Sequence, residues 1–323
     1  MTGKVLVISH IGDEHVSMVA AKTQLQFVIA DPSLFIDELQ RLSFYIDKDG
    51  NFSGMFQEHN LNDFKAFWYR KPKFLNNQNY PVVEGLRNHC QKNYMELFDT
   101  LCTAYREKFW VSNPNITDLA EIKMYQLRVA NQVGFNICNT LVSNTAKDVV
   151  LFCQNKELVV SKTMTQTRIV IDGVKRSAPV SEIKTSDELI KDVLLKELGL
   201  KLNPYIFQDY VGGIVHRVTV VNNEVFAMKT IPLKPEFLYD SRVIMLSDEY
   251  SENLTSEIPD NIKSMCLEYL KHFNLRYGAF DLIETEAGDF VFLECNPNGQ
   301  WGFVEVLTGQ DLSGAFARMF ESA

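Results

Sequence analysis

The sequence predicts a mixed α/β (α+β) protein built from three domains. Short apolar, strand-like segments alternate with stretches of helical periodicity along the chain, and 46% of the 323 residues are hydrophobic. Because single cores stop growing at roughly 250 to 300 residues, this length favours more than one domain. We expect domains at residues 1–113, 114–204 and 205–323.

The first domain is expected to be an α/β unit. Val5–Ser9, Phe44–Ile46 and Phe67–Arg70 are short apolar runs typical of strands. Tyr94–Phe109 is predicted to be a helix. The Asn113-Pro114 step then interrupts the pattern and ends the domain, because the residue before a proline avoids helical backbone.

The middle domain is expected to open with a helix from Thr117 to Gly134 that carries Lys123 on its polar face. Its apolar face has the spacing of one helical side and consists of Ile122, Tyr125, Val129 and Val133. Strands are expected over residues 137–142, 158–163 and 168–171, followed by a helix over 187–198. This region is predicted to be a small α+β domain.

The last domain is predicted to be a sheet with helices. Its strands are expected over residues 205–211, 215–221, 225–231, 277–284 and 289–295. Asn222-Asn223 should form a hairpin turn, and Gly212-Gly213 taken alone predicts another. Pro259 should lie in the first turn of a helix that reaches Phe273, and a final helix should follow Asp311.

Charge and composition exclude several classes of protein. The net charge of -9 argues against broad nucleic-acid binding, which needs a basic face. No apolar run approaches the ~18 residues of a membrane span. The six cysteines form no C-x-x-C pair and are expected as reduced thiols of a cytoplasmic protein. The motifs of P-loop, Rossmann, zinc-hydrolase and serine-hydrolase proteins are absent from the sequence.

Oxygen-bearing side chains converge in the hairpin near the C-terminus. With Ala287 and Gly288 as the central turn residues, Asp281 lies opposite Glu294, and Asn296 faces the same side. Opposed carboxylates among apolar neighbours repel unless they share a cation or a proton, and this donor set suits Mg²⁺ that also takes phosphate oxygens. A solvated hairpin is the alternative, and spacing alone leaves both open. The register divides the apolar residues into two faces: Phe280, Leu282, Leu293 and Cys295 on one, Ile283, Phe290 and Phe292 on the other.

Four basic residues add to this inventory. Lys162 and Arg217 lie within apolar strands, Lys123 lies on the amphipathic helix, and Arg242 follows Ser241. Each residue alone is weak evidence for a phosphate site. Lys123 can be an ordinary solvated lysine, and Lys162 can extend its charged end to the edge of its strand. Together with a magnesium-suited hairpin they would neutralise a triphosphate in a shielded site.

Five motifs occur in the order seen in ATP-grasp ligases, and the chain resembles that superfamily. The motifs are Phe207–Val211, His216–Val221, Asp240–Arg242, Gly278–Asp281 and Leu293–Pro297. Three further segments are similar to graspetide (microviridin-type) peptide macrocyclases: Trp68–Pro72, Leu141–Asn144 and Asn298–Trp301. The resemblance implies a three-domain ATP-grasp fold with an N-terminal pre-ATP-grasp α/β domain, and ATP and Mg²⁺ as cofactors.

The resemblance also implies roles for matching residues. Lys123 and Lys162 would hold the ATP phosphates. The hinge that contacts adenine would consist of Gln208, Asp209, Tyr210 and Val211. Related ligases usually carry an acidic residue, a ribose contact, where this chain has Val215. The ribose contact is therefore left without a residue.

In the same resemblance, Arg217 and Arg242 would be the catalytic pair that meets the phosphates or an acyl phosphate. Two magnesium ions would be held by Asp281, Glu294 and Asn296. Contacts to the substrate would come from Tyr69, Arg70 and Trp301, although core packing is the alternative interpretation of the two aromatic residues.

The activity that the resemblance implies is ATP-dependent ring closure in a precursor peptide with a leader and a core. An Asp or Glu side chain of the peptide would be phosphorylated. A Ser or Thr hydroxyl or a Lys amine would then displace phosphate and form an ester or an amide. No nucleic-acid or membrane partner is expected, and a homodimer is a further expectation.

Two other functions stay open on the sequence. One is an ATP-grasp amino-acid or glutamate ligase that modifies a protein or a small molecule. The other is an ATP-grasp protein that binds nucleotide and peptide without catalysis. The complete set of Asp281, Glu294 and Asn296 argues against the second, because the loss of one of them would be its simplest sign.

Overall fold

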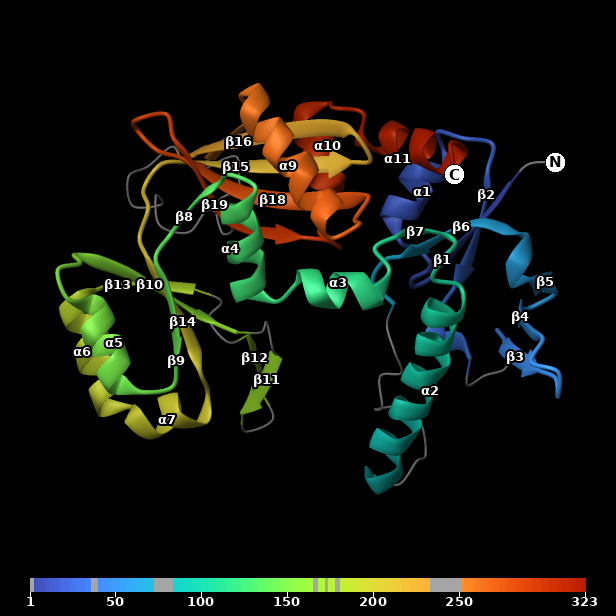
Figure 1. Ribbon diagram of the computed structural model, residues 1–323, viewed down its shortest axis with the longest axis horizontal. Helices are drawn as coiled ribbons and strands as arrows, with labels where there is room; N and C mark the ends of the chain where they lie inside the picture. The colour runs from blue at the N-terminus through green and yellow to red at the C-terminus, as the bar shows by residue number, and fades with distance from the viewer. Residues whose placement is uncertain are drawn as a thin grey trace.

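Three lobes, each with its own sheet, make up the chain (Figure 1). The computed structural model describes residues 3–35, 40–72, 84–164, 168–171, 174–177, 181–232 and 251–323. Within these ranges, no helix combines the length and the apolar character needed to cross a membrane.

The N-terminal lobe contains a four-stranded parallel sheet in the order β2-β1-β6-β7. Its strands are β1 (Lys4–Ile8), β2 (Gln26–Ala30), β6 (Phe64–Tyr69) and β7 (Phe109–Val111). One face packs on α2 (Glu84–Ala104), and the other packs on α1 (Glu14–Ala20) in a core shared with the C-terminal lobe. A small antiparallel sheet lies beside it, made of β3 (Leu42–Ile46), β4 (Phe52–Phe56) and β5 (His59–Asn60).

The predicted helix of this lobe was misplaced. It begins ten residues earlier than Tyr94, and Phe109 belongs to β7 rather than to the helix. The helix ends at Ala104, and the indole of Trp110 donates to the carbonyl of Tyr105 at 2.8 Å, which fixes the turn into β7.

The middle lobe has an antiparallel sheet in the order β13-β10-β14-β9. Its strands are β9 (Thr140–Ser143), β10 (Leu158–Thr163), β13 (Ser181–Thr185) and β14 (Tyr205–Asp209). Two helices, α5 (Ala146–Cys153) and α6 (Ser186–Leu195), pack on one face, and α7 (Glu197–Leu202) follows. A separate hairpin consists of β11 (Arg168–Ile171) and β12 (Val174–Ser177).

The C-terminal lobe has a six-stranded sheet in the order β17-β16-β15-β18-β19-β8. Its strands are β8 (Asn136–Ile137), β15 (Ile214–Val221), β16 (Glu224–Pro232), β17 (Ser251–Thr255), β18 (Tyr277–Glu284) and β19 (Phe290–Asn296). One face packs on α4 (Lys123–Gln132) and α9 (Asp260–His272), and the other packs on α10 (Gly302–Thr308) and α11 (Leu312–Glu321).

The helix predicted from Thr117 to Gly134 is two helices. The first is α3 (Pro114–Ala120), and Ile122 then adopts extended backbone before α4 begins. Gln126 stabilises this break, since its side chain donates to the carbonyl of Ala120 at 2.6 Å. Lys123 is therefore the first residue of α4 and not a residue of a helix interior.

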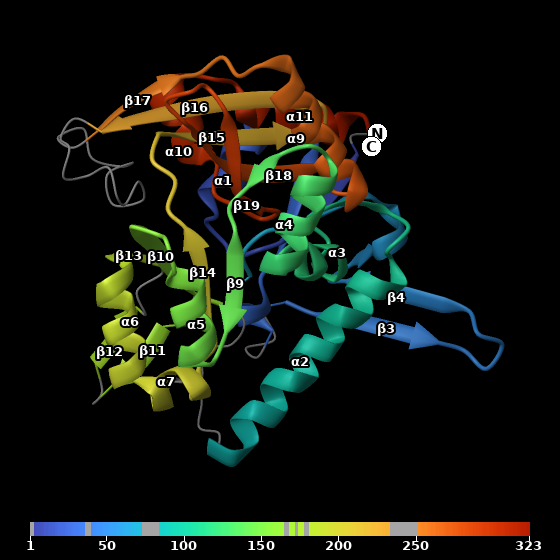
Figure 2. The same cartoon turned by 60° about the vertical axis from the view of Figure 1, so that its left-hand side comes forward.

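The chain crosses between the middle and C-terminal lobes twice (Figure 2). The strand expected over residues 137–142 is split: β8 pairs with β19, whereas β9 pairs with β14. The second crossing includes Gly212-Gly213, which is therefore not a hairpin turn. Gly213 has a φ of 152°, and a Cβ there would lie 2.2 Å from the carbonyl oxygen of Glu284, so only glycine fits.

The domain limits stay a prediction. The strand pairing favours one change, because β14 belongs to the middle sheet and the second limit then falls after Asp209.

Candidate active site

Charged side chains form a row across three neighbouring strands of the C-terminal sheet. Arg217 on β15 lies opposite Asp281 on β18, and Asp281 lies opposite Glu294 on β19. Arg217 Nη1 is 2.8 Å from Asp281 Oδ1. Lys123, at the start of α4, places its Nζ 2.7 Å from Glu294 Oε2. Each carboxylate therefore has its own cationic partner: Arg217 for Asp281 and Lys123 for Glu294.

This arrangement corrects one step of the sequence argument, which held that the two carboxylates need a shared cation or proton. Arg217 and Lys123 already compensate their charge. Burial by itself would lower the pKa of Arg217, but the charge of Asp281 together with further acidic groups, Glu294 among them, offsets this and holds the pKa above its ordinary value. The row is compatible with a metal ion but does not require one for its stability.

The predicted pairing of Asp281 with Glu294 is confirmed, but the register nearer the turn is not. Leu282 pairs with Phe292, so Leu293 is the additional residue of a β-bulge. The bulge brings Phe292 into the same core as Phe280, Leu282 and Cys295, which corrects the predicted division of the hairpin into two apolar faces.

The oxygen donors of this hairpin suit Mg²⁺. Asn296 lies two residues beyond Glu294 and accepts the backbone N–H of Asn298 on its Oδ1 at 3.0 Å. An amide oxygen has two lone pairs, so this bond leaves capacity for a cation. In the described part of the chain no three His, Cys, Asp or Glu side chains are placed to share an ion. Asn296 stays the predicted third donor beside Asp281 and Glu294, and phosphate and water would complete the shell.

Lys162 and Gln208 face away from the helices of the middle lobe. Val159 on β10 and Phe207 on β14 pack against α5 and α6. Lys162 is three positions from Val159 and Gln208 is one from Phe207, so both point to the opposite face, because side chains alternate along a strand. Lys162 also lies near Cys138 in the crossing segment: burial raises the pKa of that thiol, and the charge of Lys162 opposes the rise. Both predicted nucleotide contacts thus lie on the sheet face opposite α5 and α6.

The hinge residues have partners of their own. The amide of Gln208 donates to Thr140 Oγ1 at 3.0 Å. The carboxylate of Asp209 accepts from Lys156 and from Asn139, which ties β14 to the middle lobe. Tyr210 and Val211 follow in the second crossing segment. The side chain of Asp209 therefore has a structural role in this state.

The remaining predicted residues lie elsewhere or outside the described ranges. Arg242 falls outside the described residues. Trp301 is fully buried, and its ring centroid lies 4.8 Å from that of Phe316, on which it stacks. In this structure Trp301 therefore packs in the core and is not exposed to a substrate. Tyr69 ends β6, and burial raises the pKa of its phenol.

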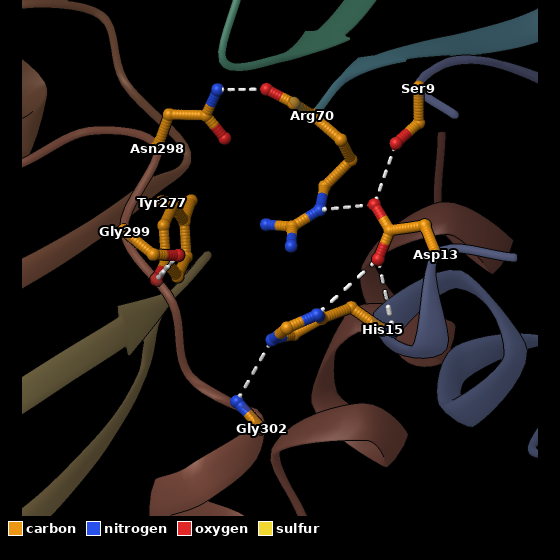
Figure 3. Close-up of polar contacts among 8 residues, drawn as sticks. All are labelled: Ser9, Asp13, His15, Arg70, Tyr277, Asn298, Gly299 and Gly302. Atoms are coloured by element: carbon orange, nitrogen blue, oxygen red, sulfur yellow. Dashed lines mark hydrogen bonds and ion pairs between the residues drawn. The ribbon is translucent and has the colours of Figure 1, made fainter. Parts of the chain in front are cut away.

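Arg70 belongs to a buried network that the sequence analysis missed (Figure 3). Its side chain is 2% exposed, and its Nε lies 3.4 Å from Asp13 Oδ2. Asp13 also accepts from Ser9 Oγ at 2.7 Å and from the backbone N–H of His15 at 3.1 Å. Burial alone would raise the pKa of Asp13, but hydrogen bonds from the side chains of His15 and Ser9 and the charge of Arg70 hold it far below its usual range.

Two sequence signals mark this network. Ser9 directly follows an apolar strand, and Asp13 has the residue type and position of an N-cap for the helix after it. Polar residues at the carboxyl ends of parallel strands share one edge of the sheet.

The fold is similar to that of solved ATP-grasp ligases, which confirms the predicted fold class. The chain is similar to a RiPP-associated ATP-grasp ligase of Chryseobacterium gregarium, solved in complex with ADP and a leader and core peptide. The TM-score is 0.85 at 23% identity, covering 100% of this chain and 98% of that chain.

Two further solved structures are similar. The macrocyclase MdnC of Microcystis aeruginosa MRC, bound with the precursor peptide MdnA, gives a TM-score of 0.82 at 22% identity and covers 100% of both chains. The ATP-grasp ligase PsnB, complexed with a phosphomimetic variant of its minimal precursor, Mg and ADP, gives 0.77 at 17% identity, covering 100% of this chain and 98% of that chain. No family model and no curated protein sequence matches the chain. The resemblance to peptide macrocyclases is thus confirmed at the level of the fold.

Proposed function

We propose that this chain is an ATP- and Mg²⁺-dependent ligase that closes rings in a precursor peptide with a leader and a core. The observation that carries the proposal is the full-length likeness to ligases solved with such peptides, which includes the N-terminal lobe. A homodimer and a cytoplasmic location stay predictions, as does the absence of a nucleic-acid partner.

The nucleotide would lie between the middle and C-terminal lobes. Lys162 on β10 and Lys123 on α4 would hold its phosphates, and residues 208–211 would contact the adenine. Mg²⁺, when bound by Asp281, Glu294 and Asn296, would neutralise phosphate charge. Lys123 and Arg217, which now pair with the carboxylates, would then be available to the phosphates.

The chemistry needs no protein nucleophile. A carboxylate oxygen of an Asp or Glu side chain in the peptide attacks the γ-phosphorus, the bond to the bridging oxygen breaks, and ADP leaves. A hydroxyl or amine of the same peptide then attacks the acyl carbon, loses its proton, and phosphate leaves. The chain would supply positioning and charge stabilisation, with Arg217 and Arg242 assigned to the transferred phosphoryl group.

Mass spectrometry of a precursor peptide incubated with enzyme, ATP and Mg²⁺ tests the proposal. We expect a product lighter by one water for each ring, with one ADP and one phosphate released each time. A gain in mass by added amino acids would support the amino-acid ligase instead. No mass change and no ATP use with the cognate peptide would support a binding protein without catalysis.

An exposed apolar patch on the middle lobe favours leader binding there. Four leucines on α6 and α7 are more than half exposed: Leu194, Leu195, Leu198 and Leu202. Exposed apolar side chains that cluster in this way mark interaction sites more often than single ones do. A leader held there would raise the concentration of the core at the ATP site, so that one site can close several rings.

Leu198→Glu tests this patch. Because full burial of a leucine is worth about 1.5–3 kcal/mol, we expect the KM for the precursor to rise by about tenfold or more while kcat changes little. Leu151→Glu is the matched control, since Leu151 is 54% exposed on α5 outside the patch. Equal KM values in both variants would contradict leader binding at the patch.

Lys162→Ala should mainly weaken nucleotide binding, because this lysine would contact ATP before the reaction. Loss of a hydrogen bond to a charged group costs about 1.5–3 kcal/mol, so we expect the Kd for ATP to rise by about 10- to 100-fold. Titration calorimetry measures this. Lys184→Ala is the control in the same sheet, since Lys184 pairs with Glu182 and Asp192. An unchanged Kd would remove Lys162 from the nucleotide site.

A further inference from the structure

The N-terminal lobe holds the loop over residues 297–301, which connects β19 to α10, and Gly302, the first residue of α10. Ser112, just after β7, donates from Oγ to the carbonyl of Pro297 at 2.7 Å. Asn298 donates from Nδ2 to the carbonyl of Arg70, just after β6 (Figure 3). The residues that follow two neighbouring parallel strands, β6 and β7, are thus hydrogen-bonded to the same loop.

His15, in the first turn of α1, holds the far end of this loop. Its Nε2 accepts the backbone N–H of Gly302 at 3.2 Å, so a neutral ring carries its proton on Nδ1, which lies 3.3 Å from Asp13 Oδ1. The same carboxylate faces Arg70 Nε (Figure 3). Asp13 therefore contacts the side chains of both His15 and Arg70, which reach the loop through a ring nitrogen and a backbone carbonyl respectively.

The backbone conformation of Ser112 is independent evidence that its contact with the loop matters. Its φ is 58°, in the left-handed region that residues other than glycine seldom adopt, and the residue is buried. Such strain persists where surrounding structure or function requires it. Glycine would relieve the backbone but would lack the hydroxyl that Pro297 accepts.

The loop in turn fixes the hairpin that carries the oxygen donors. The backbone N–H of Asn298 donates to Asn296 Oδ1 at 3.0 Å. Gly299 lies against the same hairpin, since a Cβ there would come 2.9 Å from Ala279 Cβ, and its carbonyl accepts the hydroxyl of Tyr277 at 2.9 Å. Contacts therefore run from Arg70 through Asn298 to Asn296.

We propose that Asn298 and Ser112 are positioning residues through which the N-terminal lobe sets the orientation of Asn296 and hence the affinity for Mg²⁺. The inference rests on the proposed function, because that function makes Asn296 a ligand. Removing the hydrogen-bond partner of a metal ligand commonly costs about 10- to 100-fold in metal affinity. Ser112 and Arg70 of the N-terminal lobe would then support the metal site through the loop without being ligands themselves.

The test measures ADP binding by calorimetry as the Mg²⁺ concentration is varied. Asn298→Ala keeps the backbone N–H that meets Asn296 and removes only the bond to Arg70. We expect the Mg²⁺ concentration at half-maximal binding to rise by up to about tenfold, because the hydrogen-bond partner of Asn296 is kept and only its anchor is lost. Hydrogen exchange of amides 298–302 in the ligand-free protein should also become faster. Gln132→Ala, at the exposed end of α4, is the control for loss of an amide side chain.

Ser112→Gly is the second variant, because it removes the hydroxyl while relieving the strained backbone, so folding should be preserved. It should shift the Mg²⁺ midpoint in the same direction. Unchanged midpoints in both folded variants overturn the inference, even with faster loop exchange, since the contacts would then be structural only. A wild-type protein whose ADP binding ignores Mg²⁺ overturns the metal site itself and this inference with it.

Discussion

Glu294→Gln should lower ATP turnover by about 10³-fold or more, because metal stabilisation of transition-state charge is worth several kcal/mol. Glutamine keeps the size of the side chain and one oxygen but removes the charge that would attract Mg²⁺. The side chain of Glu294 is 29% exposed, so the fold should survive the change. ADP release in the presence of precursor peptide and Mg²⁺ measures the effect, and circular dichroism checks the fold.

A carboxylate on the same hairpin supplies the control. Glu284 ends β18 and pairs with His216 at 2.9 Å, away from the charged row, so Glu284→Gln should leave turnover near the wild-type value. Near-normal turnover by Glu294→Gln with Mg²⁺ would refute the metal assignment. Lys123 loses its ion pair in this variant, and Lys123→Gln shows how much of the effect comes from the lysine alone.

Local patterns predicted the hairpin of the site well. The bounds of β18 follow from its apolar run, and Gly288 has the positive φ of 82° that a tight turn requires. The bulge at Leu293 could not be predicted, because the sequence around it is as apolar as the rest of the strand. It reflects packing of Phe292 with the helices on that face, which is a property of the whole domain.

The position of Lys123 shows the same limit. Helical periodicity continues through Ile122, so the sequence gives no sign of a break there. Gln126 explains it: its amide donates to the carbonyl of Cys295 at 2.9 Å and accepts the N–H of the same residue at 3.2 Å. This contact with β19 spans 169 residues of sequence and places Lys123 beside Glu294.

The sequence likewise could not predict which charged residues far apart in the chain contact each other. Arg217 and Asp281 were each identified as site residues, yet their contact depends on β15 lying between β16 and β18 in the sheet. Asp13 and Arg70 meet because β1 and β6 are parallel neighbours. Residue types and spacing can suggest such groups, whereas strand order decides which of them meet.

Arg217→Ala should lower kcat by about 10²–10³-fold while the KM for ATP changes little, because its guanidinium would stabilise charge that develops during phosphoryl transfer. The structure adds a second effect. Arg217 is 14% exposed and pairs with Asp281, and removing one partner of a buried pair costs up to ~3–5 kcal/mol of stability. Alanine should therefore also lower the melting temperature.

Arg217→Lys separates the two effects. A lysine keeps a positive charge beside Asp281, so stability should largely return. It lacks the planar fork of donors that matches phosphoryl oxygens, so kcat should stay well below the wild-type value. Steady-state kinetics on both variants, with thermal unfolding measured in parallel, give the two quantities. If both variants only raise the KM for ATP, Arg217 binds the nucleotide before the reaction and the catalytic role assigned to it is wrong.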